Sequence, residues 1–169
     1  IAEIVAALAD TAHAFAGKTM LIGGGWGFLG KYFAATFEYL NREVLDEPCK
    51  LIICDVSLPP EGSADRTWAG QHCRFLHHDV TEPLEIDEPL HFVVNAAAIA
   101  SPFHYQARPL ETLDASVTGT RNFLELAKAH NARLLFFSSS EIYGDPDAKH
   151  VPTPESYRGN VSCIGPRAC

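Results

Sequence analysis

The sequence has no hydrophobic run long enough to cross a membrane and no basic segment at its start. A membrane-spanning helix needs about 20 apolar residues in succession, and no stretch of this chain approaches that length. The first residues include Glu3, Asp10 and His13, where a secretory signal would carry lysine or arginine. We therefore expect neither a membrane span nor a signal peptide.

Positive charge is also scarce. The chain has 13 Lys and Arg residues against 21 Asp and Glu residues, a formal net charge of −8, and its basic residues form no cluster. Proteins that bind nucleic acid through its phosphates present a basic surface, so nucleic acid is not an expected partner. Anionic nucleotides stay open as ligands, because backbone dipoles and one or two placed arginines can hold them.

Disulfide and metal-binding patterns are missing as well. No two cysteines have the C-x-x-C spacing, and the adjacent His77 and His78 would point to opposite faces of a strand. We expect no metal site, and we expect a cytoplasmic protein with reduced thiols. The five cysteines are Cys49, Cys54, Cys73, Cys163 and Cys169.

The 169 residues, 47% of them hydrophobic and 20% charged, are enough for one domain with a hydrophobic core. Apolar residues spaced for one face predict an amphipathic helix over residues 1–16. Residues 1–18 are therefore interpreted as a helical extension, and residues 19–169 as the domain itself. Because the chain begins at Ile1, we expect its start to be trimmed.

A glycine-rich segment, GGGWGFLG, covers residues 23–30 between an apolar run and a helix-like stretch. Three of its glycines have the spacing of a dinucleotide-binding turn. The first permits a tight turn, the second lets backbone N–H groups approach a pyrophosphate, and the third lets the helix pack against its strand. The helix N-terminus then faces the phosphates with its partial positive charge. The expected cofactor contacts in this segment are Gly24, Gly27, Phe28, Leu29 and Gly30.

An acidic residue follows the next strand-like run. Asp55 lies 31 positions after Gly24 (55 − 24), against a usual spacing of about 20, and the polar stretch 41–48 accounts for the excess. A carboxylate at this place bonds the ribose hydroxyls of adenosine and repels the 2′-phosphate of NADP, so the predicted cofactor is NAD. The alternative is a solvated aspartate at a strand end.

Apolar strand-like runs alternate with helical segments at 28–40 and 110–130. Strands that are buried on both faces and joined by helices form a parallel sheet, and right-handed crossovers make that sheet doubly wound. The predicted fold class is therefore α/β with a Rossmann-like sheet, followed beyond Gly144 by a long ordered loop. The predicted strands are 19–22, 51–54, 73–77, 91–95 and 134–137.

Three further motifs follow the strands: DV at 79–80, NAAA at 95–98 and SSS at 138–140. Together with the glycine turn they resemble the extended short-chain dehydrogenase/reductase family, the NAD-dependent epimerases and dehydratases. The resemblance implies a Rossmann-like domain that binds NAD, acts on nucleotide sugars and forms homodimers through its helices. The implied cofactor contacts, the first two of them at the adenine, are Asp79, Val80, Ala96, Ala97 and Ala98.

A finer match covers nearly everything from Thr19 onward. The runs ASPFHY at 100–105, SSSEIYGDP at 138–146, GNV at 159–161 and IGPRAC at 164–169 are similar to the branch that decarboxylates UDP-glucuronate. Members of this branch oxidise the sugar at C4 with bound NAD, release the carboxylate as CO2 and return the hydride. The resemblance implies catalytic roles for Ser140, at the sugar hydroxyl, and for Glu141, in the sugar-ring step. The implied substrate contacts are Pro102, Tyr105, Asn160 and Arg167.

The chain also departs from the family. It contains no Tyr-x-x-x-Lys, and in this branch the catalytic tyrosine of that pair would directly follow Cys169. We therefore expect an inactive fragment that lacks its base and most of its substrate domain. Gly23 and Ser116 stand in place of the usual threonine and asparagine, and Ser162 and Cys163 replace an Asn-Pro pair. These changes leave the identity of the substrate open.

Other interpretations stay open. A nucleotide-sugar 4-epimerase or 4,6-dehydratase would use the same cofactor, although dehydratases carry an Asp-Glu pair where Ser140 and Glu141 stand. A non-catalytic dinucleotide-binding module would lack a Tyr-x-x-x-Lys pair after Cys169, whereas an enzyme of this family would have one.

Overall fold

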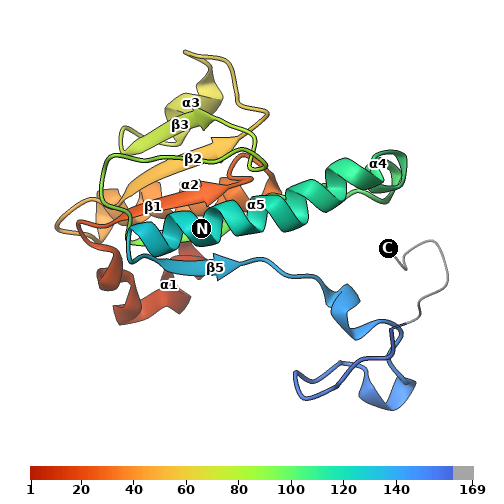
Figure 1. Ribbon diagram of the computed structural model, residues 1–169. Helices are drawn as coiled ribbons and strands as arrows, with labels where there is room; N and C mark the ends of the chain where they lie inside the picture. The colour runs from red at the N-terminus through yellow and green to blue at the C-terminus, as the bar shows by residue number, and fades with distance from the viewer. Residues whose placement is uncertain (162–169) are drawn as a thin grey trace. The chain divides into compact units, whose positions relative to one another are not determined.

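The computed structural model describes residues 1–161, in which a parallel sheet of five strands carries helices on both faces (Figure 1). The strands are β1 Thr19–Gly23, β2 Lys50–Asp55, β3 Cys73–His77, β4 Phe92–Asn95 and β5 Arg133–Phe136. The α-helices are α1 Ala2–Leu8, α2 Phe28–Glu43, α3 Ala64–Trp68, α4 Pro102–Ala107 and α5 Pro109–Ala129. The 3-10 helices are η1 Ala9–Phe15, η2 Ser140–Tyr143 and η3 Ala148–His150.

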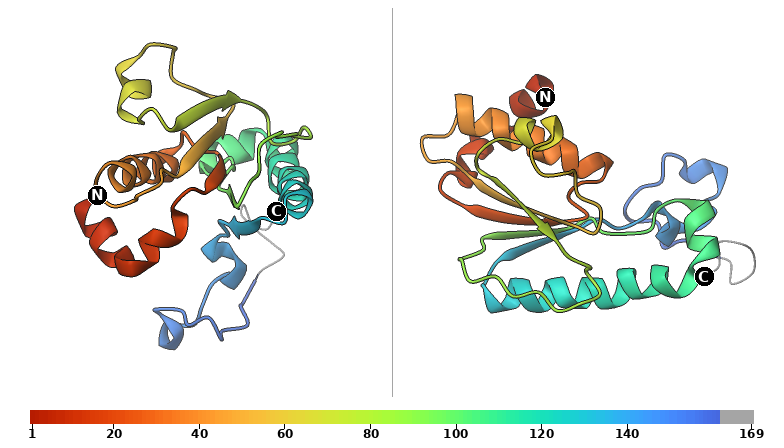
Figure 2. Two further views of the ribbon diagram at one scale, coloured as in Figure 1. Left: turned by 90° about the vertical axis from the view of Figure 1, so that its left-hand side faces the viewer. Right: turned by 90° about the horizontal axis from the view of Figure 1, so that it is seen from above.

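The strands lie in the order β3-β2-β1-β4-β5, so the direction of winding reverses between β1 and β4. Helix α2 connects β1 to β2, and α5 connects β4 to β5. Figure 2 shows these two helices on opposite faces of the sheet. This is the doubly wound, Rossmann-like arrangement, in which ligands bind beyond the carboxyl ends of the strands at the point of reversal. The predicted fold class is confirmed.

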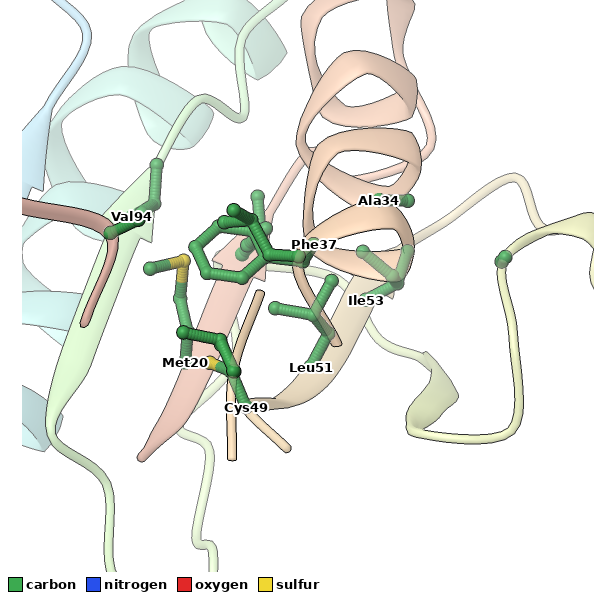
Figure 3. Packing of buried hydrophobic residues seen from close by; sticks show 12 residues of the cluster. Met20, Ala34, Phe37, Cys49, Leu51, Ile53 and Val94 are labelled. Atoms are coloured by element: carbon green, nitrogen blue, oxygen red, sulfur yellow. The ribbon is translucent and has the colours of Figure 1, made fainter. Parts of the chain in front are cut away.

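One hydrophobic cluster lies between α2 and the sheet. Phe37 and Leu40 of α2 are buried there against strand residues that include Met20, Leu51 and Val94, and Figure 3 shows Phe37 among these strand side chains. Successive side chains of a strand point to opposite faces, so alternate residues of β1 and β2 serve this cluster and the residues between them serve the opposite face.

The second cluster lies between the sheet and α5. Leu21 and Ile52, which are neighbours of residues in the first cluster, pack here with Phe123 of α5. A Cβ atom on Gly23 would lie 2.6 Å from the Phe123 ring. The close approach of α5 to the end of β1 therefore explains why glycine stands at position 23 in place of the threonine expected there.

The N-terminal segment differs from the single helix predicted for residues 1–16. Ala9 has a φ of 45°, and this left-handed residue ends α1 before the chain continues as η1. A left-handed alanine cannot continue an α-helix, so two short helices carry the apolar face. Phe15 packs on Phe37 and Phe92, with ring centroids 5.1 and 5.2 Å apart. The segment thereby covers part of the α2 cluster.

Residue contacts divide the chain into two compact units, 1–136 and 137–169. The domain limits inferred at residues 18 and 19 stay a prediction. The second unit contains η2, which ends before Gly144, and η3, which lies in the stretch beyond Gly144 where the sequence predicts only a loop. Strand β5, at the edge of the described sheet, is less buried than predicted: 51% of Leu135 and 49% of Phe136 is exposed. Among residues 1–161, no helix combines the length and the apolar character that crossing a membrane requires.

Candidate dinucleotide-binding site

The residues predicted to hold a cofactor gather at the carboxyl edge of the sheet. Gly23, at the end of β1, is paired in register with Cys54 of β2 and with Asn95 of β4. Asp55, at the end of β2, is paired with His77 of β3. The four segments that follow these strands therefore begin side by side, at the point where the winding reverses.

The glycine turn is built around Gly24. Its φ is +69°, and a Cβ atom there would lie 2.6 Å from the carbonyl oxygen of Ala96 and 2.8 Å from the Cα of Ala97. The Ala96 N–H donates to the carbonyl of Gly23 over 2.9 Å. The turn after β1 and the Ala96–Ala97 segment after β4 are thus in direct contact, which only a residue without a side chain permits.

The glycine turn leads directly into the N-terminus of α2, where no side chain caps the first backbone N–H groups. Gly27 is the N-cap of α2, and no side chain caps this end of the helix. Gly30 is buried, and a Cβ atom on it would collide with the backbone of Gly25. Phe28 and Leu29 are exposed at 76% and 47%. Since the first N–H groups of a helix have no partner inside it, this end of α2 is suited to an anion.

Asp55 stands beside the turn and is held by it. One carboxylate oxygen accepts the backbone N–H of Trp26, and the other accepts that of Ser57, each over 3.0 Å. A carboxylate has about four acceptor positions, so both oxygens keep capacity for further donors. The arrangement fixes the direction of the carboxylate and leaves it able to receive two hydroxyl groups.

Asp79 and Val80 follow β3, where the His78 N–H donates to the carbonyl of Asp55 over 3.2 Å. The backbone N–H and the hydroxyl of Thr81 both donate to the Asp79 carboxylate, and these bonds hold the pKa of Asp79 below its ordinary value. Val80 is buried, and its side chain packs against Gly119 of α5. The carboxylate of Asp79 and the backbone of Val80 are therefore the groups that this segment can offer a ligand.

Asn95 is a positioning residue that lies outside the set of site residues predicted from the sequence. Its side chain is 2% exposed, donates to the hydroxyl of Thr120 over 3.0 Å and accepts the N–H of Ala97 over 3.2 Å. It therefore fixes the Ala96–Ala97 segment against α5, while Ala98 lies exposed just beyond. A polar residue at the end of an otherwise apolar strand is the sequence signal that could have identified it.

Two expected substrate residues lie in the short helix α4. Pro102 is the first residue of α4, and the N–H of Tyr105 donates to the carbonyl of Ser101 over 2.9 Å. Proline suits this position because its missing N–H would have no partner there. Tyr105 is half-buried, whereas Pro102 is exposed.

The remaining predicted residues belong to the second unit. Ser140 and Glu141 open η2, where the Ser139 hydroxyl oxygen accepts the Glu141 N–H over 3.2 Å. Asn160 uses its side-chain NH2 to donate to the carbonyl of Asp145 over 3.0 Å, and its strand-like bridge with Gly144 closes this segment. Arg167 lies outside the described residues.

Two other features of unit 1 bear on ligand binding. Within the described part of the chain, no three His, Cys, Asp or Glu side chains are grouped so that they could hold a metal ion. A shallow hollow of about 220 Å³ lies at the amino ends of β2 and β3, the edge opposite the glycine turn. It is lined in part by Lys50, His72, Arg74 and Glu88.

The fold, the glycine turn and the residues that follow the strands define a class of protein. Residues 20–166 match the NAD dependent epimerase/dehydratase family, and the chain belongs to that family.

Several curated relatives of the chain are UDP-glucuronic acid decarboxylases. The chain is 40% identical to UDP-glucuronic acid decarboxylase 5 of Arabidopsis thaliana over 154 residues, which cover 89% of this chain and 41% of that protein. It is 48% identical to UDP-glucuronic acid decarboxylase 4 of the same plant over 152 residues, which cover 89% of this chain and 32% of that protein. The chain therefore spans less than half the length of these relatives.

A solved structure shares the fold. UDP-glucose-4-epimerase from Stenotrophomonas maltophila, with bound NAD and formylated UDP-arabinopyranose, superposes with a TM-score of 0.68 at 21% identity, covering 89% of this chain and 44% of that one. At this identity the likeness concerns the fold alone.

Proposed function

We propose that the carboxyl edge of the sheet binds NAD. The observation that carries this proposal is the contact between Gly24 and Ala96, which places the glycine turn and the uncapped end of α2 next to the segment after β4. The N–H groups of the first turn of α2 would hold the pyrophosphate. Asp55 would accept the ribose hydroxyls of the adenosine half, and Asp79 with the backbone of Val80 would hold the adenine.

We further propose that the full-length protein is a nucleotide-sugar decarboxylase that acts on UDP-glucuronate. Identity of 40% to curated UDP-glucuronic acid decarboxylases supports this activity, and Ser140 with Glu141 stands where dehydratases carry Asp-Glu. When bound, NAD supplies reversible acceptance of a hydride from C4 of the sugar. Ser140 would hold the oxygen at C4, where a ketone β to the carboxylate lets CO2 leave.

The other site residues have supporting roles in this proposal. Glu141 would act at the sugar ring, next to Ser140 in the chain. Pro102 and Tyr105 of α4, Asn160 and Arg167 would contact the nucleotide sugar. One N–H of the Asn160 NH2 group donates to Asp145, so Asn160 would offer a substrate its second N–H and its amide oxygen.

The test uses the full-length protein with NAD+ and UDP-glucuronate, read by mass spectrometry. We expect loss of CO2 from the substrate in wild-type protein and a large fall in turnover in Ser140→Ala, with NAD+ affinity unchanged. Loss of water or a mass-neutral change would assign the protein to a dehydratase or epimerase instead. No reaction with any UDP sugar, together with intact NAD+ binding, would favour a binding module.

We also propose that the protein is a cytoplasmic homodimer formed through α5. The three cysteines in the described part of the chain that could form disulfides, Cys49, Cys54 and Cys73, are unpaired, which suits a reducing compartment. Helix α5 exposes a line of apolar side chains at helical spacing, and an uncovered apolar stripe of this kind commonly marks an interface. The stripe consists of Leu110, Leu113, Val117 and Leu124, exposed at 72%, 55%, 60% and 50%.

The dimer is tested by Val117→Glu, which places a charge in the centre of the stripe. We expect light scattering to show a monomer for this variant and a dimer for the wild-type protein. Glu111→Lys, which changes charge on the same helix outside the stripe, should stay dimeric. A Val117→Glu protein that remains dimeric would refute the use of α5.

A further inference from the structure

Trp26 stands inside the glycine turn, between Gly25 and Gly27. Its ring is half-buried and has aromatic neighbours. Its backbone faces the site, because its N–H donates to the Asp55 carboxylate over 3.0 Å. Trp26 therefore contacts its aromatic neighbours through its ring and the Asp55 carboxylate, the expected ribose acceptor, through its backbone N–H.

The main contact of the Trp26 ring is with Trp68. The two rings stack with centroids 5.5 Å apart and planes 26° from parallel. Trp68 is the last residue of α3, a helix whose N-terminus is capped by the Ser63 hydroxyl. Helix α3 therefore presents the Trp68 ring from a defined position.

Two further contacts confine the Trp26 ring. The edge of Phe75 in β3 lies against it with centroids 5.2 Å apart, and the ammonium group of Lys31 lies 5.0 Å from its centroid. The Arg66 guanidinium in turn covers the Phe75 ring at 4.8 Å. The ring is thus held between α2, α3 and β3.

Because glycines flank Trp26 on both sides, the contacts of its ring affect the backbone conformation of the turn. Glycine has more backbone freedom than any other residue, so residues 25–27 have little conformational preference of their own. The Gly25 N–H donates to the carbonyl of Cys54 over 3.2 Å, and the Gly27 N–H donates to that of Gly24 over 3.1 Å. The stacked ring adds a restraint at position 26 itself, and the Trp26 N–H can orient Asp55 only while the backbone there stays in place. Loss of the stack would release the N–H, and the Asp55 carboxylate would lose one of its two backbone donors.

We propose that Trp68, by stacking on Trp26, is a positioning residue for the dinucleotide: it fixes the glycine turn so that the Trp26 N–H directs Asp55 toward the 2′-hydroxyl of the adenosine ribose. The inference rests on the proposed binding of NAD at this edge. It assigns a role in cofactor recognition to a residue of α3, an element that lies outside every motif from which the site was predicted.

The experiment measures affinity by calorimetry for two ligands, NAD+ and NAD+ that lacks the 2′-hydroxyl of its adenosine ribose. Full-length wild-type protein is compared with Trp68→Ala, which removes the ring, and Trp68→Phe, which keeps an aromatic partner for Trp26. Tyr39→Ala is the matched control, because it also removes an aromatic ring, one that lies under Arg42 and belongs to α2 away from the glycine turn. Trp68→Leu replaces Trp68→Ala if the alanine variant does not fold.

We expect wild-type protein to bind NAD+ at least about ten-fold more tightly than the 2′-deoxy ligand, since the hydroxyl bonds to a charged group. Trp68→Ala should bind NAD+ about three- to ten-fold more weakly while its affinity for the 2′-deoxy ligand barely changes, so that the preference shrinks. Trp68→Phe should restore most of the preference, and Tyr39→Ala should keep all of it.

Other outcomes separate the two proposals. Equal weakening of both ligands in Trp68→Ala would show a general structural role and overturn the positioning role alone, as would no change at all. A wild-type protein that binds NAD+ without preferring it to the 2′-deoxy ligand would also overturn the positioning role. Failure of the wild-type protein to bind either ligand would overturn the proposed NAD site itself, and the positioning role with it.

Discussion

Gly24 and Gly62 adopt the same backbone conformation in different surroundings. Their φ angles are +69° and +73°, both in the left-handed region. A Cβ atom on Gly24 would collide with Ala96, whereas one on Gly62 would meet nothing within 4 Å. The pair separates the two reasons for which a position demands glycine, its backbone angle and the space around it.

Substitution by alanine should therefore have unequal effects at these two glycines. Gly62→Ala incurs only the strain of a left-handed alanine, about 1 to 2 kcal/mol. Gly24→Ala adds a collision with backbone that cannot move aside, so we expect a loss of about 2 to 5 kcal/mol together with loss of NAD+ binding. Urea unfolding and calorimetry measure both quantities. Equal stability losses in the two variants would contradict the contact with Ala96.

Single residues also show where sequence reasoning stops. Gly24 and Asp55 could be placed at the site because their chemistry and their order along the chain follow from a local pattern. The role of Trp26 could not, because its partner Trp68 lies 42 positions later (68 − 26) in a stretch that reads as a polar loop. A stacking pair of this kind depends on how α3 folds back over β3, and no local pattern encodes that contact.

The connection between α2 and β2, residues 44–49, is closed by one side chain. Asn41 of α2 donates from Nδ2 to the carbonyl of Cys49 and accepts the Cys49 N–H at Oδ1, each over 2.8 Å. The amide thus pairs with the backbone as a neighbouring strand would. The spacing of 31 positions from Gly24 to Asp55 (55 − 24) comes largely from α2, which has 16 residues and runs to Glu43, so the first part of the polar stretch 41–48 is helix and not connection.

Removing the clamp should destabilise the protein. Asn41→Ala leaves the N–H and the carbonyl of Cys49 without their partner, and we expect the free energy of unfolding to fall by about 1 to 3 kcal/mol. Asn41→Asp keeps the acceptor and should lose less. Arg42→Ala, at the exposed neighbouring position, serves as the control for urea denaturation and should change stability little. A loss in Asn41→Ala no greater than in this control would contradict the clamp.

Length decided which elements the sequence could predict. Helices α2 and α5 repeat their apolar residues over several turns, and the strands have continuous apolar runs, so both were located within a few residues. Helices α3 and α4 have 5 and 6 residues, too few for a period of 3.6 to repeat. The break at Ala9 was missed because apolar spacing continues across it while the backbone does not.

At the scale of the whole of unit 1, buried thiols lie on both faces of the sheet. Cys49 packs in the cluster under α2 and Cys54 in the cluster under α5. Burial raises the pKa of each thiol to about 12. Since the thiolate is the reactive form, neither cysteine should react with an alkylating reagent while the hydrophobic cluster around it stays folded.

This protection predicts the behaviour of the fold in labelling experiments. At about pH 8, iodoacetamide should leave Cys49 and Cys54 unmodified in native protein, and both should react together as urea unfolds it, because one sheet supports both clusters. Peptide mass spectrometry measures the two sites separately. Modification of Cys54 at urea concentrations that leave Cys49 intact would show that the α5 face opens on its own.

The same thiols make the fold sensitive to alkali. Their pKa is raised in the folded chain, so the unfolded chain loses these protons at lower pH than the folded one. The stability that they contribute is complete below about pH 9, the ordinary range of a thiol, and falls as pH rises toward 12. We expect the urea midpoint to hold up to about pH 9 and to drop between about pH 9 and pH 11, and the midpoint of Cys54→Ala to drop less steeply. A midpoint that stays constant across this range would contradict the burial of the thiols.

The stack beside the glycine turn also has an optical consequence. The chain contains two tryptophans, and both belong to this stack, 5.5 Å apart and 26° from parallel. Indole rings at this separation share an excited state, so their transition dipoles couple and split one absorption band into two bands of opposite circular dichroism. The Trp68→Phe protein should lose this couplet while it keeps most of its preference for NAD+ over the 2′-deoxy ligand. Circular dichroism thus reports whether the glycine turn is attached to α3, independently of any ligand.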